Sequence, residues 1–187
     1  MRRLAFAGER IALATGIAPA TVLVEDGRIA AIAALGARPR DAIDVGDAVL
    51  LPGLVDTHVH VNEPGRTDGE GFAAATRGAA AGGVTTLLDM PLNSVPATTT
   101  ADALSAKRNA ALGNVVVDVG FIGGVVPAQD VHLDALWNAG VFAWKCFLVD
   151  SGVPEFPAVD EDMLRRVLPQ LARWRLPLMV HAELPGP

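Results

Sequence analysis

The chain has 187 residues, of which 51% are hydrophobic and 19% are charged, and 15 Lys and Arg against 21 Asp and Glu give a net charge of −6 at pH 7. This composition is typical of a globular protein rather than of a disordered one. An acidic chain without a basic cluster also lacks the positive charge that binds nucleic acids. The single cysteine, Cys146, excludes an internal disulfide framework and is typical of a cytoplasmic protein. Charged residues interrupt every apolar run that could serve as a signal peptide or a membrane span.

Residues 1–50 are predicted to form short β-strands. Apolar residues 21–24 and 28–32 flank the turn Glu25-Asp26-Gly27, and an Asp-Gly pair between two such runs is a strong β-hairpin signal. No amphipathic pattern of helical length occurs in this region. Because an isolated hairpin is only marginally stable in water, we expect a small all-β domain that depends on further chain.

From residue 51 onward, apolar runs alternate with helical patterns. We expect strands at 54–59, 84–90, 115–121, 141–147 and 178–181, and helices at 70–81, 101–112, 131–139 and 161–174. Glycines follow the first three helices, where a left-handed residue often ends a helix. Asp160 is placed to cap the fourth helix, and Pro169 is expected to kink that helix or divide it in two.

This alternation predicts an α/β fold with parallel strands. The strand starts are 26 to 37 residues apart, counted on the printed sequence, and this spacing matches a TIM-like (β/α)8 barrel. A doubly wound open sheet is the competing architecture, but no glycine-rich dinucleotide-binding motif follows the first strand. We therefore assign residues 51–187 to the first part of a barrel, with about five strands present, and residues 1–50 to a separate β domain.

Two histidines stand at the end of the first barrel strand. His58 and His60 are two residues apart, so on a strand their side chains point to the same side. Barrels of this kind carry their sites at the carboxyl ends of the strands, and two imidazoles at this spacing can bind one metal ion. A pair of polar strand-end residues is the plainer alternative.

Two further residues strengthen the metal interpretation. Lys145 ends the fourth strand within an apolar, aromatic segment, where burial would lower its pKa and leave a neutral amine; it could instead extend to the rim. His181 ends the fifth strand and could instead be a hydrogen-bonded core histidine. All of these residues fall at the same end of strands one, four and five, which favours a metal centre.

Residues 52–60, Pro-Gly-Leu-Val-Asp-Thr-His-Val-His, resemble the opening motif of the cyclic amidohydrolases, the family of dihydroorotases, hydantoinases and allantoinases. The resemblance implies a TIM-like barrel and a β-sandwich of which residues 1–50 form part. It also implies two divalent metal ions, with zinc as the expected metal. His58 and His60 would bind one ion, His181 the other, and a carbamylated Lys145 would bridge them. A histidine on strand six and a general acid–base aspartate on the last strand would complete this site beyond residue 187.

Three segments resemble the allantoinase branch of that family: Val-Asn-Glu-Pro-Gly-Arg-Thr at 61–67, Asp-Met-Pro-Leu-Asn-Ser at 89–94 and Ser-Gly-Val-Pro-Glu-Phe-Pro at 151–157. This implies hydrolysis of the cyclic amide of (S)-allantoin to allantoate in purine catabolism, with Asn62 and Asn93 binding substrate. Asn93 could instead only set a turn. Gly69 and Trp144 depart from the pattern, which has Trp and Phe at these positions.

Several alternatives and expectations accompany this interpretation. The protein could be a dihydroorotase or a hydantoinase (dihydropyrimidinase), a non-catalytic amidohydrolase-like assembly protein, or an inactive fragment. We expect a small cyclic ureide substrate, a cytoplasmic homotetramer, no nucleic-acid or membrane partner, and no activity from residues 1–187 alone. We expect His132 at the surface and Cys146 facing the helices, while Glu183 either orients His181 or is solvated.

Overall fold

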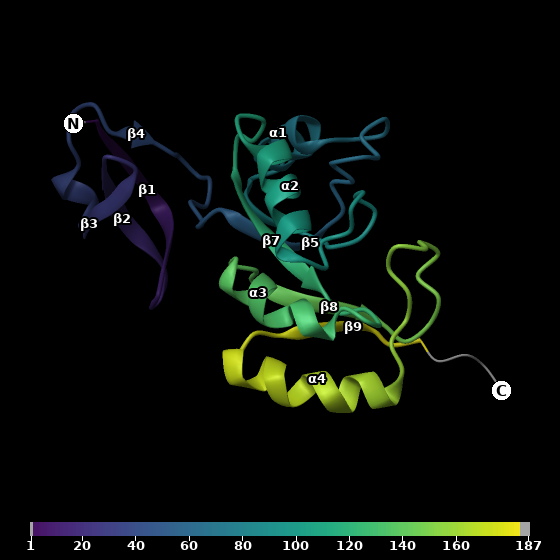
Figure 1. The fold of residues 1–187 in the computed structure, drawn as a ribbon. Coiled ribbons are helices and arrows are strands. Elements are labelled where there is room, and N and C mark those ends of the chain that lie inside the picture. Colours follow the sequence, from purple (N-terminus) through teal and green to yellow (C-terminus); the bar gives the residue numbers. More distant parts are fainter. Residues whose placement is uncertain (1, 184–187) are drawn as a thin grey trace. The chain divides into compact units, whose positions relative to one another are not determined.

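The structure, a computed structural model, describes residues 2–183 (Figure 1). It divides into two compact units, Met1–Pro52 and Gly53–Pro187. Within the described residues, none of the helices combines the length and the apolar character that crossing a membrane requires.

The first unit is a mixed four-stranded sheet with the order β3-β2-β1-β4. Its elements are β1 (Arg3–Leu13), β2 (Gly16–Glu25), β3 (Arg28–Ala33), the 3₁₀ turn η1 (Leu35–Ala37) and β4 (Ile43–Asp44). The predicted hairpin joins β2 to β3, and Asp26 and Gly27 both have positive φ, as the tight turn of a hairpin requires. A small core of Ile11, Ala20 and Val22 covers one face of the sheet. The predicted β-sandwich stays a prediction.

The second unit is a curled sheet of five parallel strands in the order β5-β6-β7-β8-β9, which confirms the predicted partial barrel. The strands are β5 (Leu54–Val59), β6 (Val84–Asp89), β7 (Asp118–Gly124), β8 (Ala143–Phe147) and β9 (Leu178–His181). The third strand begins three residues later than predicted. Pairing with β6 starts where Asp118 lies opposite Thr86. Val115 and Val117 belong to the connection from the preceding helix, and their side chains pack against the core.

Four α-helices connect these strands, namely α1 (Phe72–Ala81), α2 (Ala101–Ala111), α3 (Leu133–Asn138) and α4 (Glu161–Trp174). Gly83, Gly113 and Gly140 all have positive φ just beyond the first three helices, as expected of helix-ending glycines. The third predicted helix is divided into the 3₁₀ turn η2 (Asp130–His132) and the short α3. His132 is exposed, as predicted.

The fourth helix runs unbroken through Pro169, so of the two predicted outcomes the division is wrong, while the kink stays a prediction. Proline removes one backbone hydrogen bond from a helix interior. The apolar face of α4 compensates for this loss, because Met163, Val167 and Leu171 are all buried against the sheet. The side chain of Asp160 caps the helix by accepting a hydrogen bond from the backbone N–H of Met163 at 2.7 Å.

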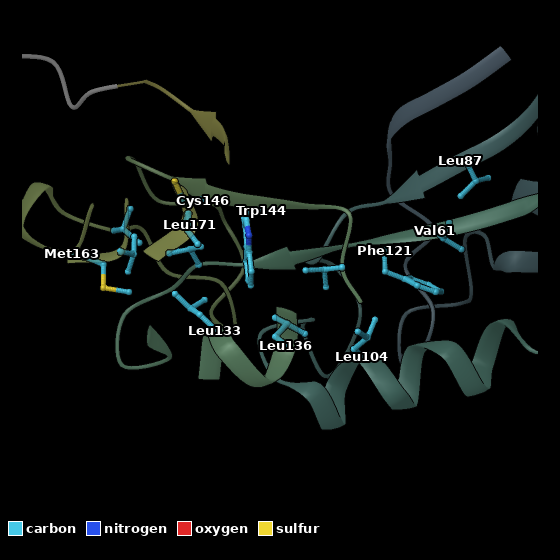
Figure 2. Close-up of a cluster of buried hydrophobic side chains, with 14 of the residues drawn as sticks. Val61, Leu87, Leu104, Phe121, Leu133, Leu136, Trp144, Cys146, Met163 and Leu171 are labelled. Atoms are coloured by element: carbon cyan, nitrogen blue, oxygen red, sulfur yellow. The ribbon is translucent and has the colours of Figure 1, made fainter. Parts of the chain in front are cut away.

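Two apolar layers lie on opposite faces of the curled sheet. The outer layer packs the strands against the helices (Figure 2) and includes Trp144 and Cys146, so the prediction that Cys146 faces the helices is confirmed. The inner layer includes Ala143 and the partly buried Phe147. Because side chains alternate along β8, Lys145 lies on the inner side with these two residues. Trp144, which departs from the family pattern, therefore lies on the face opposite Lys145.

Candidate metal centre

The histidines of β5 stand together at the carboxyl end of the strand. The ring centroids of His58 and His60 are 5.4 Å apart, and the backbone N–H of His58 donates a hydrogen bond to the Asp56 carboxylate. Burial lowers the pKa of His60, and the nearby positive charges of His58 and Lys145 lower it further. His60 is therefore biased toward the neutral imidazole, which is the form that binds a metal ion.

Lys145 is buried in the middle of β8, with 4% of its surface exposed. Its Nζ lies 4.6 Å from the centre of the Phe147 ring. Desolvation lowers the pKa of Lys145, because burial disfavours the charged ammonium ion. In the described part of the chain no carboxylate lies within ion-pair distance of this amine to offset that effect. The environment therefore shifts Lys145 toward the neutral amine relative to an exposed lysine.

His181 ends β9 beside the same aromatic ring. Its imidazole stacks on Phe147 with centroids 4.8 Å apart, because the register of β8 and β9 pairs these two residues. The His181 Nε2 atom is 3.4 Å from the carboxylate of Glu183. Phe147 thus has Lys145 and His181 as neighbours, and Glu183 is within reach of the imidazole while remaining mostly exposed.

The two asparagines singled out by the sequence lie in the loops that follow β5 and β6. The Asn93 Nδ2 atom is 3.3 Å from Nδ1 of His60, so its amide lies against the proposed metal ligand. Asn62 has a buried Oδ1 atom that has no hydrogen-bond partner among the described residues. Both residues have positive φ, a conformation that asparagine tolerates better than most residues.

An arginine ties these loops to a third one. Arg66 donates a hydrogen bond to the backbone O of Asn93 at 3.2 Å and forms a 2.7 Å ion pair with Glu155, in the loop after β8. Sequence reasoning did not single out Arg66 or Glu155. Both lie within the segments that resemble allantoinases, but their sequence separation of 89 residues leaves no local pattern that would pair them.

A buried ion pair next to the site was also missed. Asp89, at the end of β6, accepts a hydrogen bond from Lys107 of α2 at 2.7 Å, and each side chain is 1% exposed. Burial raises the pKa of Asp89 and lowers the pKa of Lys107. One signal was present, because Lys107 shares the apolar face of its helix with Leu104 and Ala111.

Within residues 2–183, no three side chains drawn from His, Cys, Asp and Glu gather closely enough to hold one metal ion. The residues expected to bind metal include a lysine, and they come from three strands of the sheet. The imidazoles of His58 on β5 and of His60 just beyond it are close together, His181 stands on β9, and Lys145 stands on β8, which lies between these strands in the sheet order. Imidazole nitrogens are ligands that zinc and other divalent metal ions accept.

Comparisons with known proteins agree on one family. Residues 49–186 match the Amidohydrolase family. The allantoinase of Streptomyces avermitilis is 50% identical over 184 residues, which cover 94% of this chain and 40% of that protein. A probable allantoinase of Oryza sativa subsp. japonica is 45% identical over 95% of this chain and 36% of its own length.

Among solved structures, the L-hydantoinase (dihydropyrimidinase) from Arthrobacter aurescens superposes with a TM-score of 0.88 at 31% identity, over 98% of this chain and 41% of that one. A D-hydantoinase gives a TM-score of 0.81 at 28% identity, over 97% of this chain and 40% of that one. The chain thus spans roughly two fifths of the proteins it matches, with 40% of the Streptomyces relative covered.

Proposed function

This chain belongs to the amidohydrolase family, and we propose that the protein containing it hydrolyses the cyclic amide bond of (S)-allantoin to give allantoate. The observation that carries the proposal is the placement of His58 and His60 at the end of β5, of Lys145 within β8 and of His181 at the end of β9. The choice of allantoin rests on the similarity to allantoinases, which reaches 50% identity over most of the chain.

We propose two divalent metal ions, with zinc as the expected metal. Bound metal would supply a hydroxide near neutral pH and polarise the amide carbonyl. The neutral imidazoles of His58 and His60 would hold one ion and His181 the other. The neutral Nζ of Lys145 would bond to the carbon of carbon dioxide and lose a proton, giving an anionic carbamate whose two oxygens can face two ions.

The asparagines are proposed to hold the substrate. A ureide ring presents carbonyl oxygens and N–H groups, and an amide side chain can both donate and accept hydrogen bonds. The buried, unpartnered Oδ1 of Asn62 is suited to accept an N–H from such a ring. Asn93 lies against His60, so a carbonyl bonded to its amide would be close to the proposed metal ligands.

A second candidate is hydrolysis of a simple hydantoin or dihydropyrimidine ring. It is supported by the TM-score of 0.88 with an L-hydantoinase, which is described by its own name as a dihydropyrimidinase. Turnover of allantoin, hydantoin, dihydrouracil and dihydroorotate by the purified, zinc-loaded protein distinguishes the candidates. Turnover of allantoin above the other three supports the proposal, and preference for another ring replaces it.

The role of Lys145 is tested by Lys145→Ala. We expect the unaltered protein to carry the added mass of one carbon dioxide on Lys145 in native mass spectrometry, and to lose activity when a chelator removes the metal. Lys145→Ala should bind less metal and lose nearly all turnover, because the bridging oxygens are gone. Arg108→Ala, at an exposed position on α2, is the control for general damage. Full metal content and turnover in Lys145→Ala would contradict the assignment.

A further inference from the structure

The buried pair of Asp89 and Lys107 lies next to the proposed metal ligands without being one of them. Asp89 ends β6, and Val59, the neighbour of His60, is its partner in the parallel ladder between β5 and β6. Beyond this point the two strands separate into the loops that carry Asn62 and Asn93. The pair therefore stands where the sheet ends and the site begins.

The two side chains replace one rung of the ladder. The last regular bond is donated by the N–H of Met90 to the carbonyl of Val59, at 2.7 Å. In a parallel ladder the next bond would join the N–H of Val61 to the carbonyl of Met90. Instead the Asp89 carboxylate accepts the N–H of Val61 at 2.8 Å, and Lys107 donates to the carbonyl of Met90 at 2.8 Å.

The ion pair completes this bridge, because Lys107 Nζ is 2.7 Å from the second oxygen of Asp89. The backbones at Val61 and Met90 are thus held by two side chains in place of a direct bond. The side chain of Val61 is fixed as well, since it is fully buried in the outer apolar layer (Figure 2). Val61, which follows His60, is therefore held through its backbone N–H by Asp89 and through its side chain by the apolar core.

Stability alone is a weak explanation for this pair. Desolvation of two charges offsets most of what a buried ion pair gains, and apolar replacements are often equally stable. Fixing one arrangement of the backbone is the better-supported use of such groups. Partners that orient a ligating histidine without touching the metal commonly set metal affinity.

We propose that Asp89 and Lys107 are positioning residues, which set the distance between the ends of β5 and β6 and so hold His60 where it can bind metal. This inference rests on the proposed metal centre. The pair acts through the backbone of Val61 and Met90 and does not itself contact substrate or metal.

The test measures zinc affinity in the protein that contains this chain, by competition with a chromophoric chelator. The double variant Asp89→Leu/Lys107→Met removes both charges together and with them both side-chain hydrogen bonds to the backbone, so no lone charge is left buried. We expect a native circular dichroism spectrum and zinc binding weakened by about 10- to 100-fold, the usual loss for partners behind a metal ligand. Glu161→Gln/Arg165→Met removes an exposed ion pair on α4 and should leave zinc affinity unchanged.

A second variant separates positioning from charge pairing. Asp89→Glu keeps the ion pair with Lys107 but displaces the carboxylate from the N–H of Val61, so a positioning role predicts weakened zinc binding here too. Zinc affinity equal to that of the unaltered protein in either folded variant overturns the proposal.

Hydrogen exchange in the unaltered protein tests the same proposal without depending on whether a variant folds. Slow hydrogen exchange at the Val61 amide, with and without zinc, is expected from the bond to Asp89, and rapid exchange overturns the proposal. If the unaltered protein binds no zinc and His58→Ala makes no difference, the metal centre fails. The exchange rate at Val61 then still decides whether the pair holds this backbone.

Discussion

The two lysines of this chain, Lys107 and Lys145, are both buried, yet their surroundings give them different chemistry. Lys107 meets the carboxylate of Asp89 and a backbone carbonyl, so its positive charge has partners. Lys145 meets the face of Phe147 and has no carboxylate within ion-pair distance among the described residues. The same residue type is thus a structural cation in one place and a candidate neutral amine in the other.

The residues of the candidate site differ in how far the sequence could reveal them. His58, His60, Lys145 and His181 could be found because each stands at the end of an apolar run, where strand direction places it. The contacts of Asp89 with Val61 and of Arg66 with Glu155 join residues from different elements. Their partners depend on how loops meet in space, which no local period encodes.

Cys146 gives a test at the same scale. Its side chain is fully buried, and desolvation raises the pKa of its thiol to about 11. Because the thiolate is the reactive form, we expect iodoacetamide at about pH 8 to leave Cys146 unmodified in the folded protein. In urea the same thiol should react at the rate of an ordinary cysteine. Mass spectrometry over time checks this, and rapid modification without denaturant would show that β8 is not packed as described.

At the scale of elements, hydrophobic periodicity predicted the bounds of those strands and helices that local sequence determines. The bounds of β5, β9 and α4 match the predicted ranges, because each has a clear apolar period between turn or cap residues. The division at Pro169 was wrong because packing against the sheet outweighs one lost hydrogen bond. The start of β7 was misplaced because an apolar run cannot tell a strand from a buried connection.

The cap of α4 provides a prediction for an element. Asp160 accepts the N–H of Met163 at 2.7 Å, and it adds a negative charge at the helix N-terminus. Asp160→Ala should lower the free energy of unfolding by about 1 kcal/mol, the usual cost of losing an N-cap side chain. Asp160→Asn should retain most of the stability that the cap contributes, because its side-chain oxygen can accept the same hydrogen bond. Urea denaturation measures both variants, and equal stability of Asp160→Ala and the unaltered protein would contradict the capping role.

At the scale of the molecule, the parallel order of the five strands followed from the alternation of strands and helices. The position of the candidate site followed from it, because the carboxyl ends of parallel strands share one edge. The apolar layers, in contrast, required the structure, since they combine residues from every helix and most strands of the second unit.

The edges of this sheet carry the last prediction. Among the described residues, β5 and β9 each pair with one strand only, and apolar side chains are exposed on both, including Leu54 at 56%, Val55 at 58% and Val180 at 39%. Open, apolar strand edges favour pairing with other chains. A polypeptide of residues 1–187 should therefore self-associate with rising concentration, as measured by sedimentation velocity, and should bind a dye specific for apolar surface.

Substitutions at an edge and away from it make this test specific. Val180→Lys places a charge on β9 and should reduce self-association, because a lysine on an edge strand opposes pairing with a second chain. Leu112→Lys removes an even more exposed apolar residue, at 80%, but one that follows α2 and lies on no strand, so it should have little effect. A monomer at every concentration, or an equal response to both substitutions, would show that the strand edges do not drive association.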